Sequence, residues 1–430
     1  MATVAQRDTA EEPGERSGSS RNEGTGFRAA ASLLKRNTEF RRLYFAEIIS
    51  FGGDWFLIVA LFSLVLEHEG TAMTLAFTVV AQELPFFLMS PVGGALADRL
   101  DRKKLMIATD VARAILCLGF LFVGSADMLW LAFLLLAAIS SLAAIFDPAS
   151  GAAIPNLVDK EDLATANSLG GSAWGTMLAV GAGIGGIVVA TLGNQTAFAI
   201  DSFSFAASAL LLSRISRPFS EERRGEHPSI WRATMDTFSY ANRDRRVWAF
   251  LSVKGGFGLA GGVLIFISIF AYDIYEAGAT GIGILMAARG VGALIGPFVG
   301  RWIAGSDDRR LFTAIGLALF TFGISYGAFG FAPSILVAAP LVMLAHFGGG
   351  AQWALSSYGL QKIVPDHIRG RVVAVDFALI TLTFGISSLV AGVAADVMGP
   401  RRAVIALAAV AICWATVWWF STRKIRRTGI

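Results

Sequence analysis

Nine charged side chains inside long apolar stretches of this sequence are candidates for chemistry, because water is scarce there. They are Glu47, Asp54, Glu83, Asp110, Arg113, Asp201, Lys254, Arg289 and Asp376. A charge at the centre of a bilayer costs roughly 2.5–3.5 kcal/mol on insertion scales, so each of these groups should be paired or should serve a function. A carboxyl group in low-dielectric surroundings holds a proton more readily than it does in water. The chemistry indicated is proton binding and ion pairing.

Spacing indicates how four of these charges are arranged. Glu47 and Asp54 are seven residues apart, which places both on one face of a helix. Asp110 and Arg113 are three residues apart and can pair on a helix surface, which would satisfy both charges and make their role structural. We therefore expect proton binding at the first two residues and ion pairing at the second two.

Three further charges have less obvious partners. Glu83 lies two residues before Pro85, which kinks a helix and frees a backbone carbonyl. Glu83 therefore either faces a cavity, where it is a further candidate for proton coupling, or caps that defect. Arg289 lies deep in its apolar segment and is the candidate contact for an anionic substrate group. Lys254 lies near a helix end, from which a lysine can extend to the membrane surface.

The composition is that of a membrane protein. Of the 430 residues, 55% are hydrophobic and only 16% are charged, and the mean hydropathy is +0.61. Soluble domains carry about 25% charged residues. A chain with this much apolar surface is therefore expected to cross a bilayer several times.

Several other functions are disfavoured by the sequence. The net charge of +4 is attributed to loops that contact anionic lipid headgroups rather than to nucleic-acid binding. Cys117 and Cys413 lie in apolar runs, and the four histidines show no metal-ligand spacing. No Gly-x4-Gly-Lys-Ser/Thr motif is present for nucleotide binding. We expect no cofactor, no metal and no enzymatic activity.

Twelve apolar segments are long enough to span a bilayer, which takes ~20 residues. They lie at about 43–66, 72–97, 104–123, 129–146, 163–191, 196–212, 247–272, 281–304, 311–331, 334–356, 372–397 and 403–420. The expected fold is an all-α integral membrane protein with two pseudo-symmetric six-helix halves. The expected organisation is a disordered tail (1–38), an N-terminal half (39–213), a linker (214–246), a C-terminal half (247–421) and a short tail (422–430).

The positions of Lys and Arg predict an orientation. If the N-terminus lies inside, all inner connections carry Lys or Arg, whereas the outer connections carry only Arg401 and Arg402. Cytoplasmic loops hold an excess of these residues. Both termini, the linker and both tails are therefore expected on the cytoplasmic side.

The two halves repeat a short pattern. Pro91–Gly94 followed by Lys103–Leu105 matches Pro297–Gly300 followed by Arg309–Leu311 at one constant offset. Duplicated halves place a substrate site between them, near the bilayer midplane. The charges differ, however, because Ala304 occupies the position equivalent to Asp98.

Glycines recur at four-residue spacing in the fifth and eighth segments. They are Gly181, Gly185, Gly292, Gly296 and Gly300. Small residues at this spacing allow helices to approach closely in a membrane. We expect these glycines to pack the halves against each other, with purely structural packing as the alternative.

The stretch from Gly94 to Lys103, GALADRLDRK, resembles the signature between helices two and three of the major facilitator superfamily. Ile49–Phe56, Asp110-x-x-Arg113 and Phe146-Asp147-Pro148 resemble its branch of drug:proton antiporters, which includes macrolide and siderophore exporters. The resemblance covers about residues 39–420. The chain departs from the pattern at Asp101, where Gly is usual, and in the fifth segment, which lacks the Pro of the exporter motif.

The resemblance implies roles for particular residues. Gly94, Asp98, Arg99, Arg102 and Lys103 correspond to the gate motif of the superfamily. In that family the motif touches helix eleven when the protein opens outward. Asp376 is therefore expected to meet Arg99, Arg102 or the helix end at Asp98. The alternative to a structural pairing of Arg113 with Asp110 is that Arg113 exchanges partners with Asp98 as the gate opens.

The function implied by the resemblance is secondary transport by a monomer in a bacterial-type cytoplasmic membrane. Its partners would be protons, lipid and a small amphipathic compound that is exported, with Asp54 the leading proton carrier. An importer or uniporter on the same fold remains open, because the exporter Pro is missing. A scaffold or membrane enzyme is disfavoured, because an enzyme needs clustered nucleophiles or metal ligands.

Overall fold

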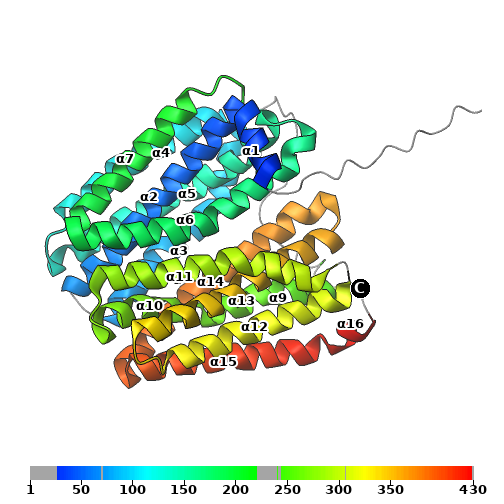
Figure 1. Cartoon of the computed structure of the whole chain (residues 1–430). Coiled ribbons are helices and arrows are strands. Elements are labelled where there is room, and N and C mark those ends of the chain that lie inside the picture. The colour runs from blue at the N-terminus through cyan, green and yellow to red at the C-terminus, as the bar shows by residue number, and fades with distance from the viewer. Residues whose placement is uncertain (1–26, 69–70, 220–239, 241–243, 306, 429–430) are drawn as a thin grey trace, which may run out of the picture.

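The computed structural model describes residues 27–68, 71–219, 240, 244–305 and 307–428 (Figure 1). Within these residues, twelve helical segments are long and apolar enough to cross a membrane, and no strand is formed. The expected all-α fold with twelve spans is confirmed. Its helices form two bundles, one from each half of the chain, stacked above and below each other in the view of Figure 1.

The helices follow the apolar segments, with ends that extend into the polar connections. The N-terminal half contains α2 (Thr38–His68), α3 (Ala72–Arg99), α4 (Arg102–Gly119), α5 (Leu129–Leu157), α6 (Leu163–Leu192) and α7 (Asn194–Ser213). The C-terminal half contains α9 (Arg245–Gly261), α10 (Ile265–Ile269), α11 (Gly278–Ala304), α12 (Asp308–Phe329), α13 (Ile335–Ile363), α14 (Asp366–Met398) and α15 (Pro400–Ser421).

Part of the segment expected to be a disordered tail is helical. Phe27–Arg36 forms α1, and Leu33 is fully buried in an apolar cluster with Val158 and Ala166. Arg36 forms an ion pair with Asp162 at the start of α6. The expectation of disorder is wrong here, because the apolar side of this short helix finds a partner on the N-terminal half.

The remaining polar segments are described only in part. The tail before residue 27 and the linker residues 220–239 and 241–243 lie outside the described residues. The described start of the linker is packed against the N-terminal half, with Ile215 and Phe219 buried. The C-terminal segment expected as a tail contains the short helix α16 (Arg423–Thr428).

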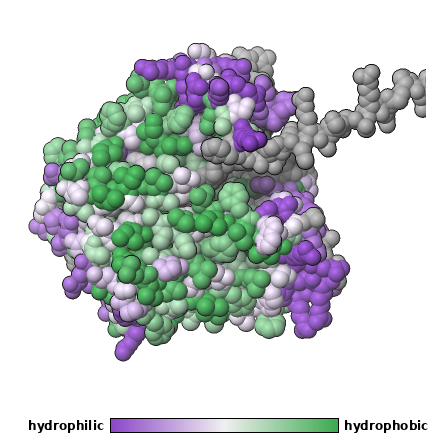
Figure 2. Space-filling model, viewed as in Figure 1, coloured by the Kyte–Doolittle hydropathy of each residue, from purple (hydrophilic) through white to green (hydrophobic). Residues whose placement is uncertain are grey.

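Nearly all described basic residues of the connections gather at one end of the bundle, which we call the basic end. This end carries α1 and α16 (Figure 1), and polar residues cover it in Figure 2, whereas apolar residues dominate the middle of the surface. Arg401 lies at the opposite, far end. Its guanidinium donates hydrogen bonds of 3.0 Å to the carbonyls of Gly330 and Ala332, so it caps the connection between α12 and α13.

The two ends differ in how the halves are joined. At the far end, one cluster of buried apolar residues runs through both halves, from Leu57–Leu66 of α2 to Val263–Ile267 in the C-terminal half. At the basic end, the described buried apolar residues form separate clusters for each half. Apolar packing therefore closes the space between the halves at the far end. At the basic end, no apolar cluster of the described residues is shared by the two halves.

The glycines that pack the two halves are not those expected. Gly181 and Gly185 face α2 within the N-terminal half. Gly292, Gly296 and Gly300 face α13 within the C-terminal half, at residues 343–355. The expectation that they join the halves is therefore wrong, because four-residue spacing selects one helix face and the face it selects points into the same half.

The contact between α6 and α11 is instead made by glycines on another face. A Cβ on Gly186 would lie 2.7 Å from the Cα of Gly283, and a Cβ on Gly290 would clash with Ala179. At these points the two backbones touch directly. The close contact between α6 and α11 therefore depends on glycines, which have no side chain.

The sequence indicated one continuous helix for the seventh span, but the structure shows that this span is interrupted. The side chain of Ser387 on α14 accepts a hydrogen bond from the backbone N–H of Gly262 (3.0 Å) and donates one to the carbonyl of Leu259 (2.6 Å). A side chain inserted into a helical hydrogen-bond ladder breaks it. The span accordingly passes from α9 into a 3-10 turn at Gly262–Leu264.

We predict that Gly283→Ala weakens the far-end contact between the halves. The added Cβ would lie 2.8 Å from the Cα of Gly186, and overpacking of this kind costs about 1–3 kcal/mol. Distances between spin labels at Leu192 and Val397, exposed far-end positions of different halves, should shift to longer values. Gly255→Ala is the control, because no atom lies within 4 Å of its added Cβ. Identical distance distributions in both variants would contradict the assignment.

Candidate functional site

The N-terminal half contains one buried guanidinium held between two aromatic rings. Arg113 on α4 lies 4.6 Å from the ring centroid of Phe146 and 4.4 Å from that of Phe205. It donates to Asp110, one turn earlier on the same helix, and Ser208 donates a hydrogen bond of 2.6 Å to the other carboxylate oxygen. Arg113 and Asp110 are 3% and 0% exposed, so this pair lies in the interior of the bundle.

Three more carboxylates lie within electrostatic range of this guanidinium. The charge of Arg113 acts on Asp54 of α2, Asp147 of α5 and Asp201 of α7. Asp201 reaches α2 because position 53 is glycine: a Cβ there would clash with the side chains of Asp201 and Ser204. Four helices thus bring four carboxylates to one cation.

These carboxylates differ in exposure and in bonding. Asp110 and Asp201 are both 0% exposed, and Asp201 accepts hydrogen bonds from Cys117 (3.1 Å) and Ser204 (3.2 Å). Asp54 is partly exposed, Asp147 is exposed, and neither accepts a hydrogen bond within the described residues. Of the four carboxylates, only Asp54 and Asp147 are not fully covered by protein and also have oxygen atoms without a hydrogen-bond donor among the described residues.

Asp147 is the main site residue that the sequence reasoning did not select, although its tripeptide contributed to the resemblance. The sequence feature that could have identified Asp147 is a carboxylate next to Pro148 in an apolar segment. Its charge also acts on Glu47, which accepts a hydrogen bond from Ser150, one turn beyond Asp147. Glu47 and Asp54 therefore both point from one face of α2 toward this charged region.

Arg289 is the charge of the C-terminal half nearest to this region. Its guanidinium carbon lies 5.8 Å from the ring centroid of Trp55, the neighbour of Asp54 on α2. Its Nε is buried without a partner, and its contact through Nη1 is 3.8 Å from the sulfur of Met286. Glu83 on α3 acts on Arg289 electrostatically without forming an ion pair with it.

His346, one of the four histidines without metal-ligand spacing, is hydrogen-bonded within the C-terminal half. Its Nε2 lies 2.8 Å from the hydroxyl of Tyr326. Both side chains are buried. They line the C-terminal side of Arg289 but offer it no negative charge.

Asp376 does not meet Arg99 or Arg102 in this structure. Its partner is Lys254, and both side chains are 1% exposed. Lys254 also donates to Ser357 (2.9 Å) and lies 4.5 Å from the ring centroid of Trp353. The expectation of an extended Lys254 is wrong, because α9 and α14 pack closely and bring the two charges together inside the bundle. The expected contact of Asp376 with the motif belongs to the outward-open form and stays a prediction.

The motif between α3 and α4 binds backbone carbonyls at the basic end. Arg102 is 4% exposed and donates to the carbonyls of Ala97 and Ala152 at 2.9 Å and of Phe219 at 3.2 Å. Lys103 donates to the carbonyls of Ser213 and Ile215 at 2.9 and 2.5 Å.

The other residues of the motif lie at the surface of the protein. Asp98 is 3.8 Å from Arg102, Arg99 is exposed, and Gly94 has open space beside it. Arg113 is paired with Asp110 rather than with Asp98. The motif therefore ties α3 and α4 to α5 and to the start of the linker.

No group of three or more potential metal ligands is found among the described residues. The site as built can bind protons on its partly exposed carboxylates and can pair charged groups of a ligand. It offers no constellation for covalent chemistry in the part of the chain that the structure describes.

Comparison with known proteins places these features in context. A family model described as transmembrane secretion effector matches residues 30–427. The multidrug efflux pump Tap of Mycolicibacterium fortuitum is 26% identical over 383 residues, which cover 85% of this chain and 91% of that protein. The putative bacilysin exporter BacE of Bacillus subtilis (strain 168) is 27% identical over 369 residues, which cover 83% and 88%.

Solved structures show the same fold. A bacterial homologue of the human lysosomal transporter Spinster, inward-facing and unoccupied, has a TM-score of 0.71 at 14% identity and covers 93% of this chain and 98% of its own. A bacterial homologue of the iron transporter ferroportin, also inward-facing, has a TM-score of 0.67 at 16% identity, with 90% and 98% covered. At these identities the likeness concerns the fold alone.

We predict that Asp376→Asn strongly destabilises the protein. Removing one partner of a buried ion pair leaves an uncompensated charge and costs about 3–5 kcal/mol, so the apparent melting temperature of the purified protein should fall sharply. The double variant Lys254→Gln/Asp376→Asn should recover most of this loss. Lys362→Gln, which breaks an exposed pair with Asp308, should cost at most about 1 kcal/mol. Equal losses in the single and double variants would show that the pair does not govern stability.

Proposed function

Because the chain belongs to the transmembrane secretion effector family of the major facilitator superfamily, we propose that it exports a small amphipathic compound in exchange for protons. Membrane transport follows from the family, and the relatives are named as an efflux pump and an exporter. The coupling to protons and the class of compound are the proposed elements. The protein is further proposed to work as a monomer, with both termini on the cytoplasmic side of a bacterial cytoplasmic membrane.

One observation carries the proton coupling: four carboxylates lie within electrostatic range of one guanidinium inside the bundle, and only Asp110 is paired with it. If all four were ionised, the cluster would hold three uncompensated negative charges in a low-dielectric region. Isolated charges there cost several kcal/mol each. Protonation of some of these carboxyl groups removes that cost.

The positions of the carboxylates divide their roles. Asp110 and Asp201 are fully buried and hydrogen-bonded, so they hold Arg113 and α7 in place. Asp54 and Asp147 are less completely covered by protein and have no hydrogen-bond donor within the described residues. They are therefore the proposed proton carriers, and Glu47 and Glu83 are the carboxylates that extend the path.

Coupling requires that protons and cargo favour different conformations. Protonation of Asp54 or Asp147 changes the number of charges on the wall of the N-terminal half. A cargo bound between the halves changes the same balance. Protons and cargo thus shift the same equilibrium, between the conformation in which the halves are packed together at the far end and the one in which they are separated there.

We predict that Asp54→Asn and Asp147→Asn each abolish the use of the proton gradient. Everted vesicles that contain either variant should lose roughly ten-fold or more of gradient-driven efflux of a fluorescent amphipathic dye. Exchange of the dye without a gradient should continue, because the path through the bundle is intact. Glu161→Gln, a carboxylate outside the cluster on an exposed connection, is the control and should transport normally. Full gradient-driven transport in both Asn variants would refute the assignment, and uptake that follows the gradient would indicate an importer.

The two copies of the repeated motif should not contribute equally. Asp98 lies 3.8 Å from the buried Arg102, whereas the equivalent of Arg102 in the second copy is Asp308, in an exposed pair with Lys362. We predict that Asp98→Asn lowers the transport rate more than Asp308→Asn does, at equal amounts of protein in the membrane. Equal rates for both variants would show that the first motif only anchors the helices.

A further inference from the structure

The linker begins with a segment that is bound to the N-terminal half. Residues 214–219, which we call the strap, follow α7 and form no helix. Within the strap, Ile215 is 1% exposed and Phe219 is 2% exposed, and both belong to an apolar cluster with Ala97 and Leu157. Connecting segments usually run over the surface of a protein. The strap therefore occupies a binding surface at the basic end of this half.

Side chains of the motif between α3 and α4 hold the backbone of the strap. Arg102 donates a hydrogen bond of 3.2 Å to the carbonyl of Phe219, and Lys103 donates one of 2.5 Å to the carbonyl of Ile215. Asn156 of α5 donates a hydrogen bond of 2.6 Å to the same carbonyl of Phe219. Hydrogen bonds from charged donors are stronger than neutral ones, so the two cations of the motif bind the strap tightly.

The other side of the strap is bound to α2. The backbone N–H of Ser216 donates a hydrogen bond of 2.6 Å to Glu39, and Arg42 donates one of 2.5 Å to the carbonyl of Arg214. Glu39 and Arg42 also form an ion pair of 3.0 Å with each other. The strap thus lies between the start of α2 and the motif, and it is held from both sides.

The strap supplies an acceptor that Arg102 needs. Arg102 donates to three backbone carbonyls, of which those of Ala97 and Ala152 belong to α3 and α5. The third belongs to Phe219 of the strap, whose buried ring fixes its position. Arg102 is 4% exposed, so water does not readily replace a lost acceptor, and an unpaired buried donor is costly. Loss of the ring would therefore release the guanidinium for other partners at the basic end.

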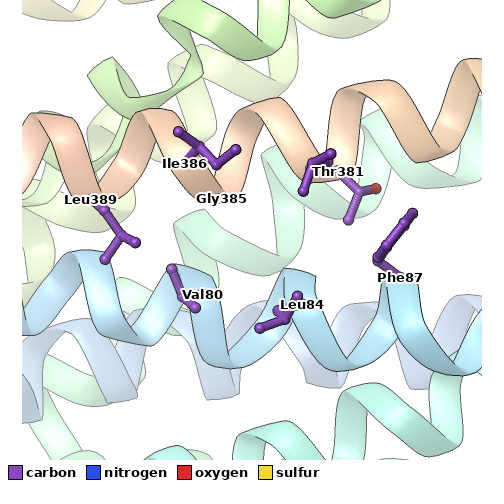
Figure 3. A pocket seen from close by; sticks show the side chains of 8 residues that line it. Val80, Leu84, Phe87, Thr381, Gly385, Ile386 and Leu389 are labelled. Atoms are coloured by element: carbon purple, nitrogen blue, oxygen red, sulfur yellow. The ribbon is translucent and has the colours of Figure 1, made fainter.

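Apolar contacts between the halves do not fix the basic ends of their helices. The helix that leads into the motif, α3, meets α14 of the other half through apolar side chains, and Val80 lies across from Leu389 in Figure 3. This contact leaves a cavity of about 110 Å³. At the basic end, the described buried apolar residues form separate clusters for each half. The distance between the halves at this end therefore depends on polar groups, including those of the motif.

We propose that Phe219 is a positioning residue for transport that acts through Arg102. Its buried ring holds the strap carbonyl that binds the guanidinium, so the charge stays on the N-terminal half and the basic end stays open. When the strap is released, Arg102 binds acceptors of the C-terminal half, and the halves come together at this end. The strap shifts this equilibrium because it binds the guanidinium in only one of the two arrangements. The inference rests on membrane transport, which follows from the family, and not on the proposed coupling to protons.

The distance between the halves at the basic end tests the proposal. Spin labels at Lys160 and Arg309, exposed positions of different halves, report it in the purified protein in nanodiscs, without any gradient. The background carries Cys413→Ser, because this native cysteine is exposed. We expect Phe219→Ala to raise the population with the shorter distance about three-fold or more. Phe219→Leu should keep the wild-type distribution, because leucine retains most of the apolar contact.

A double-variant cycle shows whether Phe219 acts through Arg102. In an Arg102→Gln background, Phe219→Ala should leave the distance distribution unchanged, since no guanidinium remains to be released. Phe312→Ala is the control for general loosening, because its ring is fully buried in a cluster of the C-terminal half that does not include the motif. Its effect should be the same in both backgrounds, as is expected for independent sites.

Each result decides the proposal. An equal shift by Phe219→Ala in both backgrounds would show that the strap only stabilises the fold, and no shift in the wild-type background would also overturn the proposal. If Phe219→Ala yields no folded protein, Asn156→Ala removes the other donor to the same carbonyl. It should then raise the short-distance population about two-fold, again only when Arg102 is present, and the absence of this shift would overturn the proposal. Because no gradient is applied, these shifts in a protein that transports without protons would refute only the proposed coupling.

Discussion

The N-terminal half depends on one electrostatic constraint: a single buried guanidinium, that of Arg113, lies within electrostatic range of four carboxylates. Two of these carboxylates are fixed by hydrogen bonds from Ser208, Ser204 and Cys117. The remaining two have no donor among the described residues and are less completely covered by protein. Excess negative charge of this kind is costly unless it is reduced, and this cost is the basis of the proposed coupling of transport to protons.

The packing of the halves serves this constraint. A glycine at position 53 lets α7 bring Asp201 against α2, and two aromatic rings confine Arg113. The C-terminal half uses a related device, since Lys254 is paired with Asp376 and also lies against aromatic rings. That pair is balanced one to one, whereas Arg289 lies against Trp55 of the N-terminal half and its buried Nε has no hydrogen-bond partner.

Local features of the sequence predicted most of the architecture. Apolar length identified the twelve spans, and short spacing predicted that Asp110 and Arg113 could pair and that Glu47 and Asp54 share a helix face. Contacts between distant segments could not be found in this way. Lys254 and Asp376 are 122 residues apart, and nothing in the sequence around either residue identifies the other. The break in the seventh span likewise depends on Ser387 of another helix, and helical spacing selects a glycine face without revealing which helix it meets.

The central claim is that carboxyl groups near Arg113 carry protons at neutral pH. Infrared spectroscopy of the purified protein in lipid tests it directly, because the C=O stretch of a protonated carboxyl group is separate from the bands of a carboxylate. A pH titration should show such a band near neutral pH, and it should weaken in both Asp54→Asn and Asp147→Asn. A spectrum without a protonated carboxyl band near neutral pH, or one unchanged in both variants, would contradict the account.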